Sequence, residues 1–176
     1  MKWLVRTIGG LVALAVLLLA IGLLLPSHFR VERMANINAP AERVYALLAD
    51  PREWQRWTVW NQRDPAMKVD YSGPASGVGA RWAWQSKAEG NGEMEFIEAL
   101  PSQRIGYKLS FPDLGMQSAG VVTIAPASAG VRVSWTNEGE MGANPINRWF
   151  GLFMDRMVGK DFEAGLANLK RLAEAG

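Results

Sequence analysis

Between residues 67 and 140 the chain alternates apolar and polar side chains over six short segments, which limits it to a fold built on an antiparallel sheet. In MKVDYSG, every second residue from Met67 is apolar. The other segments lie in ARWAWQSKAEGNGEMEFIEAL, which predicts a hairpin with its turn at Asn91-Gly92, and in QRIGYKLSF, SAGVVTIAP and GVRVSWTNEGE. Strands of this kind form a sheet with one buried face and one wet face.

Helices are predicted on both sides of this strand region. HFRVERMANI predicts one further strand, and PAERVYALLAD then predicts a helix that begins at Pro40 and ends before Pro51. A longer helix is predicted from Pro145 to about Ala173, and it is the largest element available to cover the buried face of the sheet. Its apolar stripe changes direction at Gly159, a residue type that weakens helices, so we expect a kink or break there. One long helix that wraps a twisted sheet is the alternative.

No charged residue occurs from Thr7 to Ser27, where Leu, Val, Ile and Ala predominate. About 20 such residues match the roughly 30 Å hydrocarbon core of a bilayer, so residues 7–25 are predicted to cross a membrane. The domains are then an N-terminal transmembrane anchor, residues 1–27, and a folded domain, residues 28–176. A cleaved signal peptide is the alternative, although this apolar run exceeds the roughly 7–15 residues of a usual signal core.

The predicted location is the cell membrane, with a single pass. Basic residues on the two sides of the span are nearly balanced, so the positive-inside rule gives little direction. A short N-terminal tail is easily kept in the cytoplasm, which favours a folded domain on the extracytoplasmic side.

Charge and composition exclude several classes of function. Of the 19 basic residues, Lys2 and Arg6 precede the apolar run, and the remaining 17 match the 17 acidic residues in number. They are scattered, so nucleic acid is not an expected partner. The absence of cysteine excludes disulfides and thiolate catalysis, and the single histidine, His28, argues against a Ser-His-Asp triad or a His-rich metal site. We expect no metal and no cofactor.

Three of the eight tryptophans, Trp54, Trp57 and Trp60, stand three residues apart in the polar stretch EWQRWTVWNQRDP. They either close one end of a sheet–helix core or face the mouth of a cavity, where an indole offers apolar area and one N–H donor. Trp57 and Trp60 are the stronger cavity candidates. The residues predicted to line a ligand pocket are Trp57, Trp60, Tyr71, Trp82, Trp84, Phe96, Tyr107, Trp135, Phe150, Phe153 and Met157.

Few polar residues share the phase of the apolar ones. Glu98 and Asn137 do, but each is near the end of a predicted strand, so we expect both to be exposed, with a place in the pocket as the alternative. Asp155 and Asp161 of the last helix are acid–base candidates in principle, and Asp155 is expected to be solvated. No catalytic residue is assigned.

The order of elements, with INAPAERVYALLADPREWQRW, DPAMKVDYSGPASGVGARWAW, VRVSW and GKDFEAGLANLKRLAE, resembles the SRPBCC superfamily over about residues 30–173. This superfamily includes START-type lipid carriers and Bet v 1-like ligand binders, and the chain is similar to its bacterial polyketide cyclase/dehydrase-like branch, in which an N-terminal membrane helix is frequent. The resemblance implies an α+β helix-grip fold, in which a curved antiparallel β-sheet wraps around a long C-terminal helix, here preceded by one transmembrane helix. It carries no catalytic set, and the Rieske-type branch, which binds iron through histidines, is excluded because His28 stands alone.

These observations predict a membrane-anchored protein that binds a hydrophobic or amphipathic small molecule, such as a lipid, isoprenoid or polyketide-like compound, between the sheet and the C-terminal helix. A cyclase or dehydratase that acts in the same cavity is one alternative, and it would need an inward ionisable group with a perturbed pKa. A membrane-associated protein-interaction module is another, and it would need a filled interior and an exposed aromatic patch.

Overall fold

The body of the molecule is built on one antiparallel sheet, in which the first strand lies at one edge and pairs with the last strand. The computed structural model describes residues 2–175, and within them the seven strands lie in the spatial order β1-β7-β6-β5-β4-β3-β2. All six alternating segments form strands, as predicted. The strands are β1 (His28–Ile37), β2 (Lys68–Ser72), β3 (Arg81–Gln85), β4 (Gly92–Leu100), β5 (Arg104–Phe111), β6 (Met116–Pro126) and β7 (Val131–Glu140).

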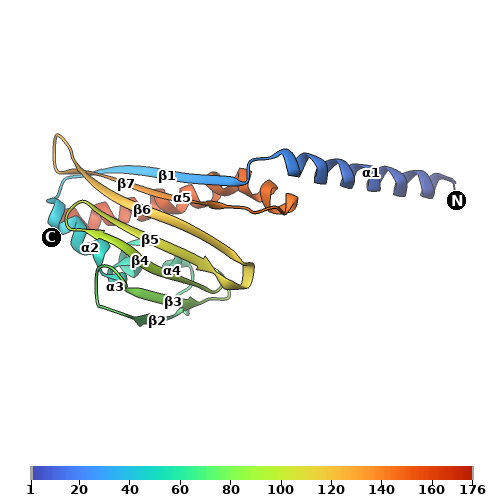
Figure 1. Cartoon of the computed structure of the whole chain (residues 1–176). Helices are drawn as coiled ribbons and strands as arrows, with labels where there is room; N and C mark the ends of the chain where they lie inside the picture. Colours follow the sequence, from blue (N-terminus) through green and yellow to red (C-terminus); the bar gives the residue numbers. More distant parts are fainter. Residues whose placement is uncertain (1, 176) are drawn as a thin grey trace.

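The helices surround the curved face of this sheet, apart from the first one. They are α1 (Lys2–Leu24), α2 (Ala41–Ala49), α3 (Pro51–Trp57), α4 (Trp60–Arg63) and α5 (Pro145–Ala175), with a short 3-10 helix, η1 (Pro112–Leu114), before β6. Asp50 separates α2 from α3 and caps α3, because its carboxylate accepts a 2.8 Å hydrogen bond from the Arg52 amide. Figure 1 shows α5 lying along the sheet, and the predicted α+β helix-grip fold is confirmed.

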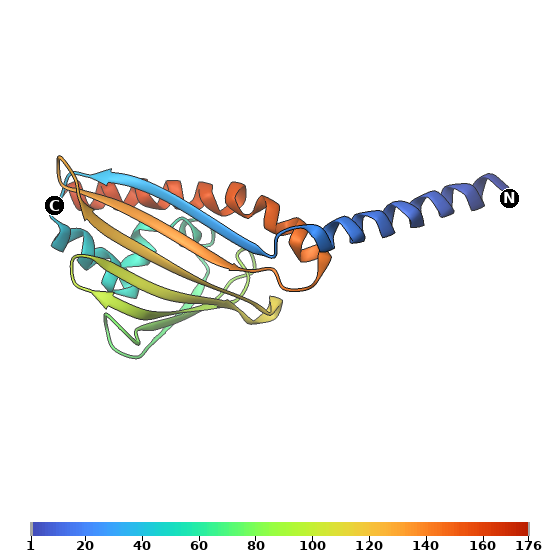
Figure 2. The same ribbon diagram turned by 45° about the horizontal axis from the view of Figure 1, so that its top comes forward.

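The helix α1 projects from the body as a separate rod, as Figures 1 and 2 show from two directions. Its stretch from Arg6 to Leu24 is long enough and apolar enough to cross a membrane, and only 6% of that stretch is buried. A helix with this composition and so little burial fits either a membrane span or a signal sequence.

A cluster of aromatic rings fills the space between the sheet and the helices α3 and α5. Trp135 of β7 stacks on Phe162 of α5, with ring centroids 3.7 Å apart and planes 4° from parallel. Gly165 permits this approach, since a Cβ there would lie 3.0 Å from the Trp135 ring. Trp54 of α3 joins helices to strands, with centroids 4.6–5.7 Å from those of five rings, Trp57, Trp82, Phe96, Tyr107 and Trp135. Aromatic pairs of this kind each contribute about 0.5–1.5 kcal/mol beyond area burial.

Of the kink or break predicted at Gly159, the break is wrong, and α5 is one long helix, as the alternative had it. Helix α5 runs uninterrupted from Pro145 to Ala175. Gly159 serves close packing instead, because a Cβ at this position would overlap the guanidinium of Arg33 from β1.

The predicted turn at Asn91-Gly92 is also wrong in detail. The loop between β3 and β4 covers residues 86–91, with Gly90 in the left-handed region at φ 76°. Gly92 is already the first residue of β4 and pairs with Trp84. Its missing side chain leaves room for the Trp84 indole, which a Cβ would overlap.

Candidate functional site

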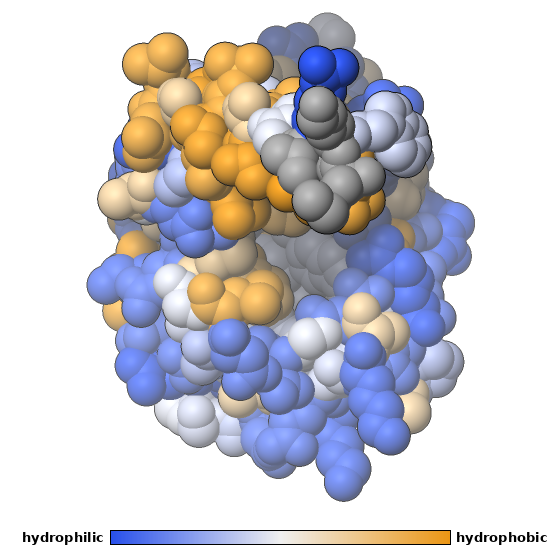
Figure 3. All heavy atoms as spheres, turned by 90° about the vertical axis from the view of Figure 1, so that its right-hand side faces the viewer, coloured by the Kyte–Doolittle hydropathy of each residue, from blue (hydrophilic) through white to orange (hydrophobic). Residues whose placement is uncertain are grey.

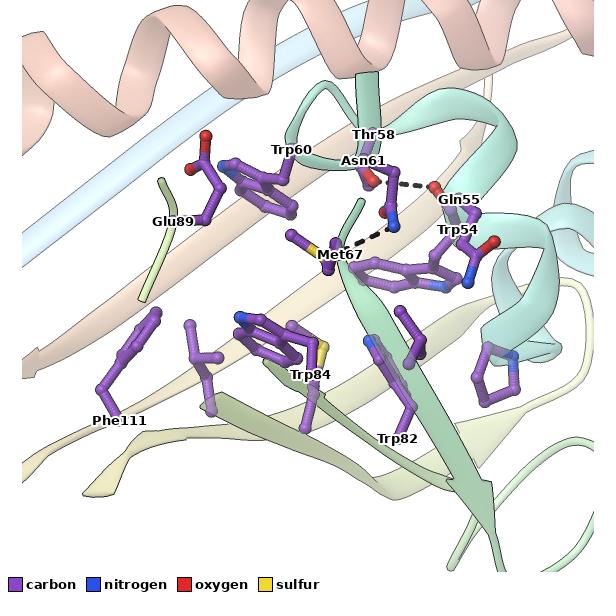
Figure 4. Close-up of a pocket in the computed structure, with 14 residues that line it drawn as sticks. Trp54, Gln55, Thr58, Trp60, Asn61, Met67, Trp82, Trp84, Glu89 and Phe111 are labelled. Atoms are coloured by element: carbon purple, nitrogen blue, oxygen red, sulfur yellow. Dashed lines mark hydrogen bonds between the residues drawn. The ribbon is translucent and has the colours of Figure 1, made fainter. Parts of the chain in front are cut away.

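Two adjoining cavities lie between the sheet and the helices. The first has a volume of about 90 Å³, and Figure 4 shows Trp54 and Trp60 on its helical side and Trp82 and Trp84 on its strand side. The second has a volume of about 120 Å³ and is covered by the N-terminal half of α5. Residues on the walls of both are Trp60, Met94, Leu109 and Phe111.

Trp60 lies between the two cavities and is held from α5. Its indole N–H donates a 3.0 Å hydrogen bond to the carboxylate of Asp161. Arg63, at the end of α4, binds the same carboxylate and that of Glu89, each with a shortest N–O distance of 2.7 Å. The hydrogen bond to Asp161, and then that to Glu89, raises the pKa of the Arg63 guanidinium above its usual value. The wall between the cavities is therefore fixed by α4, α5 and the β3–β4 loop together.

Three residues that lie side by side on β5, β6 and β7 bring a phenol and an amide to the second cavity. Tyr107 of β5 pairs with Gly120 of β6, and Gly120 pairs with Asn137 of β7. Gly120 leaves the space that the Tyr107 phenol occupies, since a Cβ there would overlap that ring. The Tyr107 hydroxyl accepts a 2.8 Å hydrogen bond from the Trp135 indole, and burial raises the pKa of Tyr107, so the phenol is neutral at physiological pH.

Asn137 is the second polar member of this row. Its side chain is on the wall of the second cavity, the residue is 4% exposed, and Oδ1 has no hydrogen-bond partner within residues 2–175. The expectation that Asn137 is exposed at a strand end is wrong, because β7 continues to Glu140 and pairs with β1 beyond this point. A buried amide oxygen without a partner costs about 1–3 kcal/mol, so Asn137 places an unpaired acceptor next to the second cavity.

The residues predicted from the sequence to line the pocket are found in three places: on the cavity walls, in the packed core and outside both cavities. Those on a cavity wall are Trp60, Trp82, Trp84 and Tyr107. Those packed in the core, on neither wall, are Trp57, Phe96 and Trp135. Trp57 is the last residue of α3 and is fully buried, with its indole donating a 3.1 Å hydrogen bond to the Leu47 carbonyl. Contact of any of these residues with a ligand stays a prediction.

The remaining selected residues lie outside both cavities. Tyr71 is on the edge strand β2, where its hydroxyl accepts a hydrogen bond from Gln55 and the Arg52 guanidinium lies 4.9 Å from the ring centre. The other three lie on α5 with more than half of their surface exposed: Phe150, Phe153 and Met157.

Sequence reasoning did not select several residues that form the walls. Trp54, which the sequence favours less than Trp57 and Trp60, is on the wall of the first cavity. Leu109 and Phe111 continue the alternation of Tyr107 along β5, and this phase was the signal that could have selected them. Asn137 carries a similar signal, because it keeps the inward phase of Trp135.

The acidic candidates are all paired with arginine. A bulge between Phe96 and Glu98 shifts the phase of β4, so Glu98 is partly exposed, with 38% of its side chain accessible, and it pairs with Arg104. Asp155 is exposed, as expected, and its hydrogen bond from Arg33 lowers its pKa. Asp161 is bound by Arg63 and Trp60.

Comparison with protein families places this architecture. A family described as "Polyketide cyclase / dehydrase and lipid transport" matches residues 28–174. The chain belongs to this family. The match begins at the first residue of β1 and ends next to the last residue of α5, so the polyketide cyclase/dehydrase and lipid transport domain is the whole helix-grip body without α1. No curated protein matches the chain.

Solved structures share the fold of this polyketide cyclase/dehydrase and lipid transport domain at low identity. Protein CV1439 from Chromobacterium violaceum is 25% identical, with a TM-score of 0.55, over 85% of this chain and 99% of that one. Protein MLL2253 from Mesorhizobium loti is 18% identical, with a TM-score of 0.58, over 81% and 95%. The di-domain ARO/CYC StfQ from the steffimycin biosynthetic pathway is 13% identical, with a TM-score of 0.62, over 84% of this chain and 51% of that one.

Proposed function

We propose that this protein binds a small apolar molecule that carries one hydrogen-bond donor, and that α1 anchors the binding domain in a membrane. The observation that supports the binding most strongly is the buried, unpaired Oδ1 of Asn137, a residue on the wall of the second cavity. In an apolar cavity, one well-placed acceptor orients a ligand, while apolar contacts provide most of the affinity.

The cavity volumes limit the size of the ligand. About 90 Å³ and about 120 Å³ are smaller than the roughly 150 Å³ apolar cavity that holds benzene, and far below the roughly 300–1,000 Å³ of usual ligand sites. Neither cavity alone therefore matches the space that benzene occupies there. A single ring or a short acyl segment, as the expected guest, would use space from both cavities, which share Trp60 as a wall. A larger lipid or polyketide would require Trp60 to swing away, which breaks its hydrogen bond to Asp161.

The family description supports the chemical class of the ligand. Polyketides and lipids are both largely apolar molecules with a few polar groups, and the walls of the two cavities consist mainly of aromatic, leucine and methionine side chains. Methionine at position 94, which lines both cavities, is adaptable enough to follow ligands of different shape.

Catalysis in the same cavity has less support. General acid–base chemistry needs a titratable group free to exchange a proton with the substrate. Glu89 lies on the wall of the first cavity and Asp161 holds Trp60, but Arg63 binds both carboxylates. Tyr107 is neutral, and its hydroxyl already accepts a hydrogen bond from Trp135.

The binding is tested by small molecules that co-purify with the full chain in nanodiscs of one synthetic phosphatidylcholine. Organic extracts of the wild type, of Leu109→Phe and of Ile97→Phe are compared by mass spectrometry with extracts of empty nanodiscs. Leu109 lines both cavities, so a phenyl ring there fills space that a ligand needs, whereas Ile97 is exposed on β4 and receives the same ring outside.

We expect an apolar compound in the wild type and in Ile97→Phe, and a loss of most of it in Leu109→Phe. Equal amounts in the two variants would place the compound outside the cavities. No enrichment over empty nanodiscs in the wild type would overturn the binding proposal.

A further inference from the structure

The first turns of α5 are packed against the last turns of α1. Gly22 of α1 faces Pro145 and Trp149 of α5, where a Cβ would lie 2.7 Å from the Pro145 carbonyl oxygen and 3.0 Å from the Trp149 indole nitrogen. The Trp149 indole donates a 3.1 Å hydrogen bond to the Leu18 carbonyl. Figures 1 and 2 both show α1 leaving the body beside the start of α5. The two helices therefore form a joint with defined contacts.

Arg148 completes the end of α1. Its guanidinium donates hydrogen bonds of 2.7 Å to the Leu23 carbonyl and 3.2 Å to the Leu25 carbonyl. The last carbonyls of a helix have no partner within the helix, and they carry its partial negative charge, so an arginine there satisfies them. Arg148 is also the one charged residue in the sequence from Pro145 to Met154.

The same part of α5 exposes large apolar side chains. Their exposed fractions are 50–62%, and they are Ile146, Phe150, Leu152, Phe153 and Met157. Figure 3 views the molecule from the end at which α1 projects: hydrophobic residues, those of α1 among them, occupy the upper part of the view, and mostly hydrophilic ones lie below. An apolar surface this concentrated, continuous with α1, is unusual for a face in water.

We infer that the N-terminal part of α5, residues 145–154, is immersed in the lipid bilayer together with α1. The inference rests on the proposed anchoring of α1. Leu18 precedes Leu24, the end of α1, by six positions, which places its carbonyl about 9 Å deeper along the helix axis at ~1.5 Å per residue. Trp149, hydrogen-bonded to that carbonyl, therefore lies below the membrane surface wherever α1 crosses it.

The pairing of polar groups fits this depth. In a bilayer, backbone and side-chain donors must find partners within the protein. The Trp149 N–H binds a carbonyl of α1, and the charged group of Arg148 is bound by the Leu23 carbonyl of α1 and the Leu25 carbonyl just after it. The first acidic residue of α5, Asp155, pairs with Arg33 of β1 and marks where α5 leaves the lipid.

Immersion gives the second cavity a defined orientation. Two of its wall residues, Phe29 near the start of β1 and Met116 at the start of β6, lie at the end of the sheet from which α1 projects, and Met154 of α5 lines it too. The cavity would thus face the bilayer, so an apolar ligand could reach it from lipid without crossing water.

The test uses the absence of cysteine, which lets a nitroxide be placed at one position at a time. The full chain in phosphatidylcholine vesicles is labelled in Phe150→Cys, Phe153→Cys, Leu14→Cys and Ala164→Cys. Ala164 is an exposed position farther along α5 and serves as the matched control, and Leu14 reports on α1. Collision of each label with oxygen, which concentrates in lipid, is compared with collision with a water-soluble nickel chelate.

We expect the labels at 14, 150 and 153 to favour oxygen over nickel severalfold more than the label at 164. If 150 and 153 behave like 164 while 14 favours oxygen, α5 lies outside the bilayer and the inference fails, but the anchor stands. If 14 also behaves like 164, the anchoring itself fails and the inference with it. Labels at 150 and 153 that neither reagent reaches would mean that another protein chain covers this surface, which also overturns the inference. None of these outcomes depends on ligand binding by the cavities.

Discussion

Arg33 of β1 lies directly against Gly159 of α5, so closely that any side chain at Gly159 would overlap its guanidinium. From this position Arg33 donates hydrogen bonds of 2.7 Å to Asp155 and 2.6 Å to Glu163, the carboxylates on either side of the glycine. The edge strand β1 is thereby attached to the middle of α5. The glycine that looked like a weak point of the helix is what allows this attachment.

A double-mutant cycle at Gly159 and Arg33 tests that role. In an Arg33→Ala background, Gly159→Ala should stabilise the full chain in micelles by about 1 kcal/mol, because alanine is the better helix former. In the wild-type background the same change displaces the guanidinium, so most of this gain should be lost. The measurement is chemical denaturation of the four proteins, and equal effects of Gly159→Ala in both backgrounds would contradict the role.

Tyr107 predicts a loss of stability at high pH. Burial raises its pKa above the usual value near 10, so the folded protein keeps a proton that the unfolded chain releases. Its contribution to stability is therefore complete below pH 10 and declines as the pH rises toward the pKa of the folded state. For one proton the limiting slope is about 1.4 kcal/mol per pH unit.

Tyr107→Phe should remove that slope while making the protein less stable at neutral pH, because the Trp135 indole loses its acceptor. Denaturation of both proteins between pH 9 and about 11.5 measures the difference. Burial also raises the pKa of Tyr45 and Tyr71, but both are present in the two proteins, so their effect cancels in the comparison. Parallel stability curves would show that Tyr107 is not protected from ionisation.

Asn137 predicts opposite effects on stability and on binding. Asn137→Leu removes the unpaired Oδ1 and should stabilise the empty protein by about 1 kcal/mol. The same change should abolish any preference for a ligand with a donor. Fluorine NMR with 4-fluorophenol and 4-fluorotoluene measures this preference, because the two probes differ in one hydroxyl group.

The wild type should bind 4-fluorophenol more tightly, by roughly 1–2 kcal/mol after correction for partition into the membrane mimic, and Asn137→Leu should bind both probes alike. Leu109→Phe should weaken both. A wild type that does not distinguish the two probes would exclude Asn137 as the orienting acceptor.

The fold follows from the sequence because side-chain phase and element order suffice to determine which faces are buried. The site follows less well. The alternation of a strand shows which side chains point inward, but a displacement of a few ångströms decides whether an inward ring is packed in the core or lines a cavity. Trp57 and Trp60 share the same spacing, yet α3 ends at Trp57 and α4 begins at Trp60, so one indole is buried in the core and the other borders both cavities. The overlap at Gly159 depends on a partner 126 positions earlier in the chain, Arg33, which no local pattern indicates.

The joint between α1 and α5 can be opened without touching the domain core. Gly22→Leu places a side chain where even a Cβ would contact the Pro145 carbonyl and the Trp149 indole, so α1 must move away from α5. Gly10→Leu is the matched control, since a Cβ at Gly10 meets nothing within 4 Å. With a nitroxide at position 150, Gly22→Leu should lower oxygen collision and raise nickel collision, whereas Gly10→Leu should change neither.

The unfolding of the body, followed by aromatic circular dichroism, should be the same in both variants, because Gly22 lies outside the cluster around Trp54 and Trp135. A label that stays in lipid in Gly22→Leu would show that α5 holds its place in the bilayer through its own apolar side chains and needs no contact with α1.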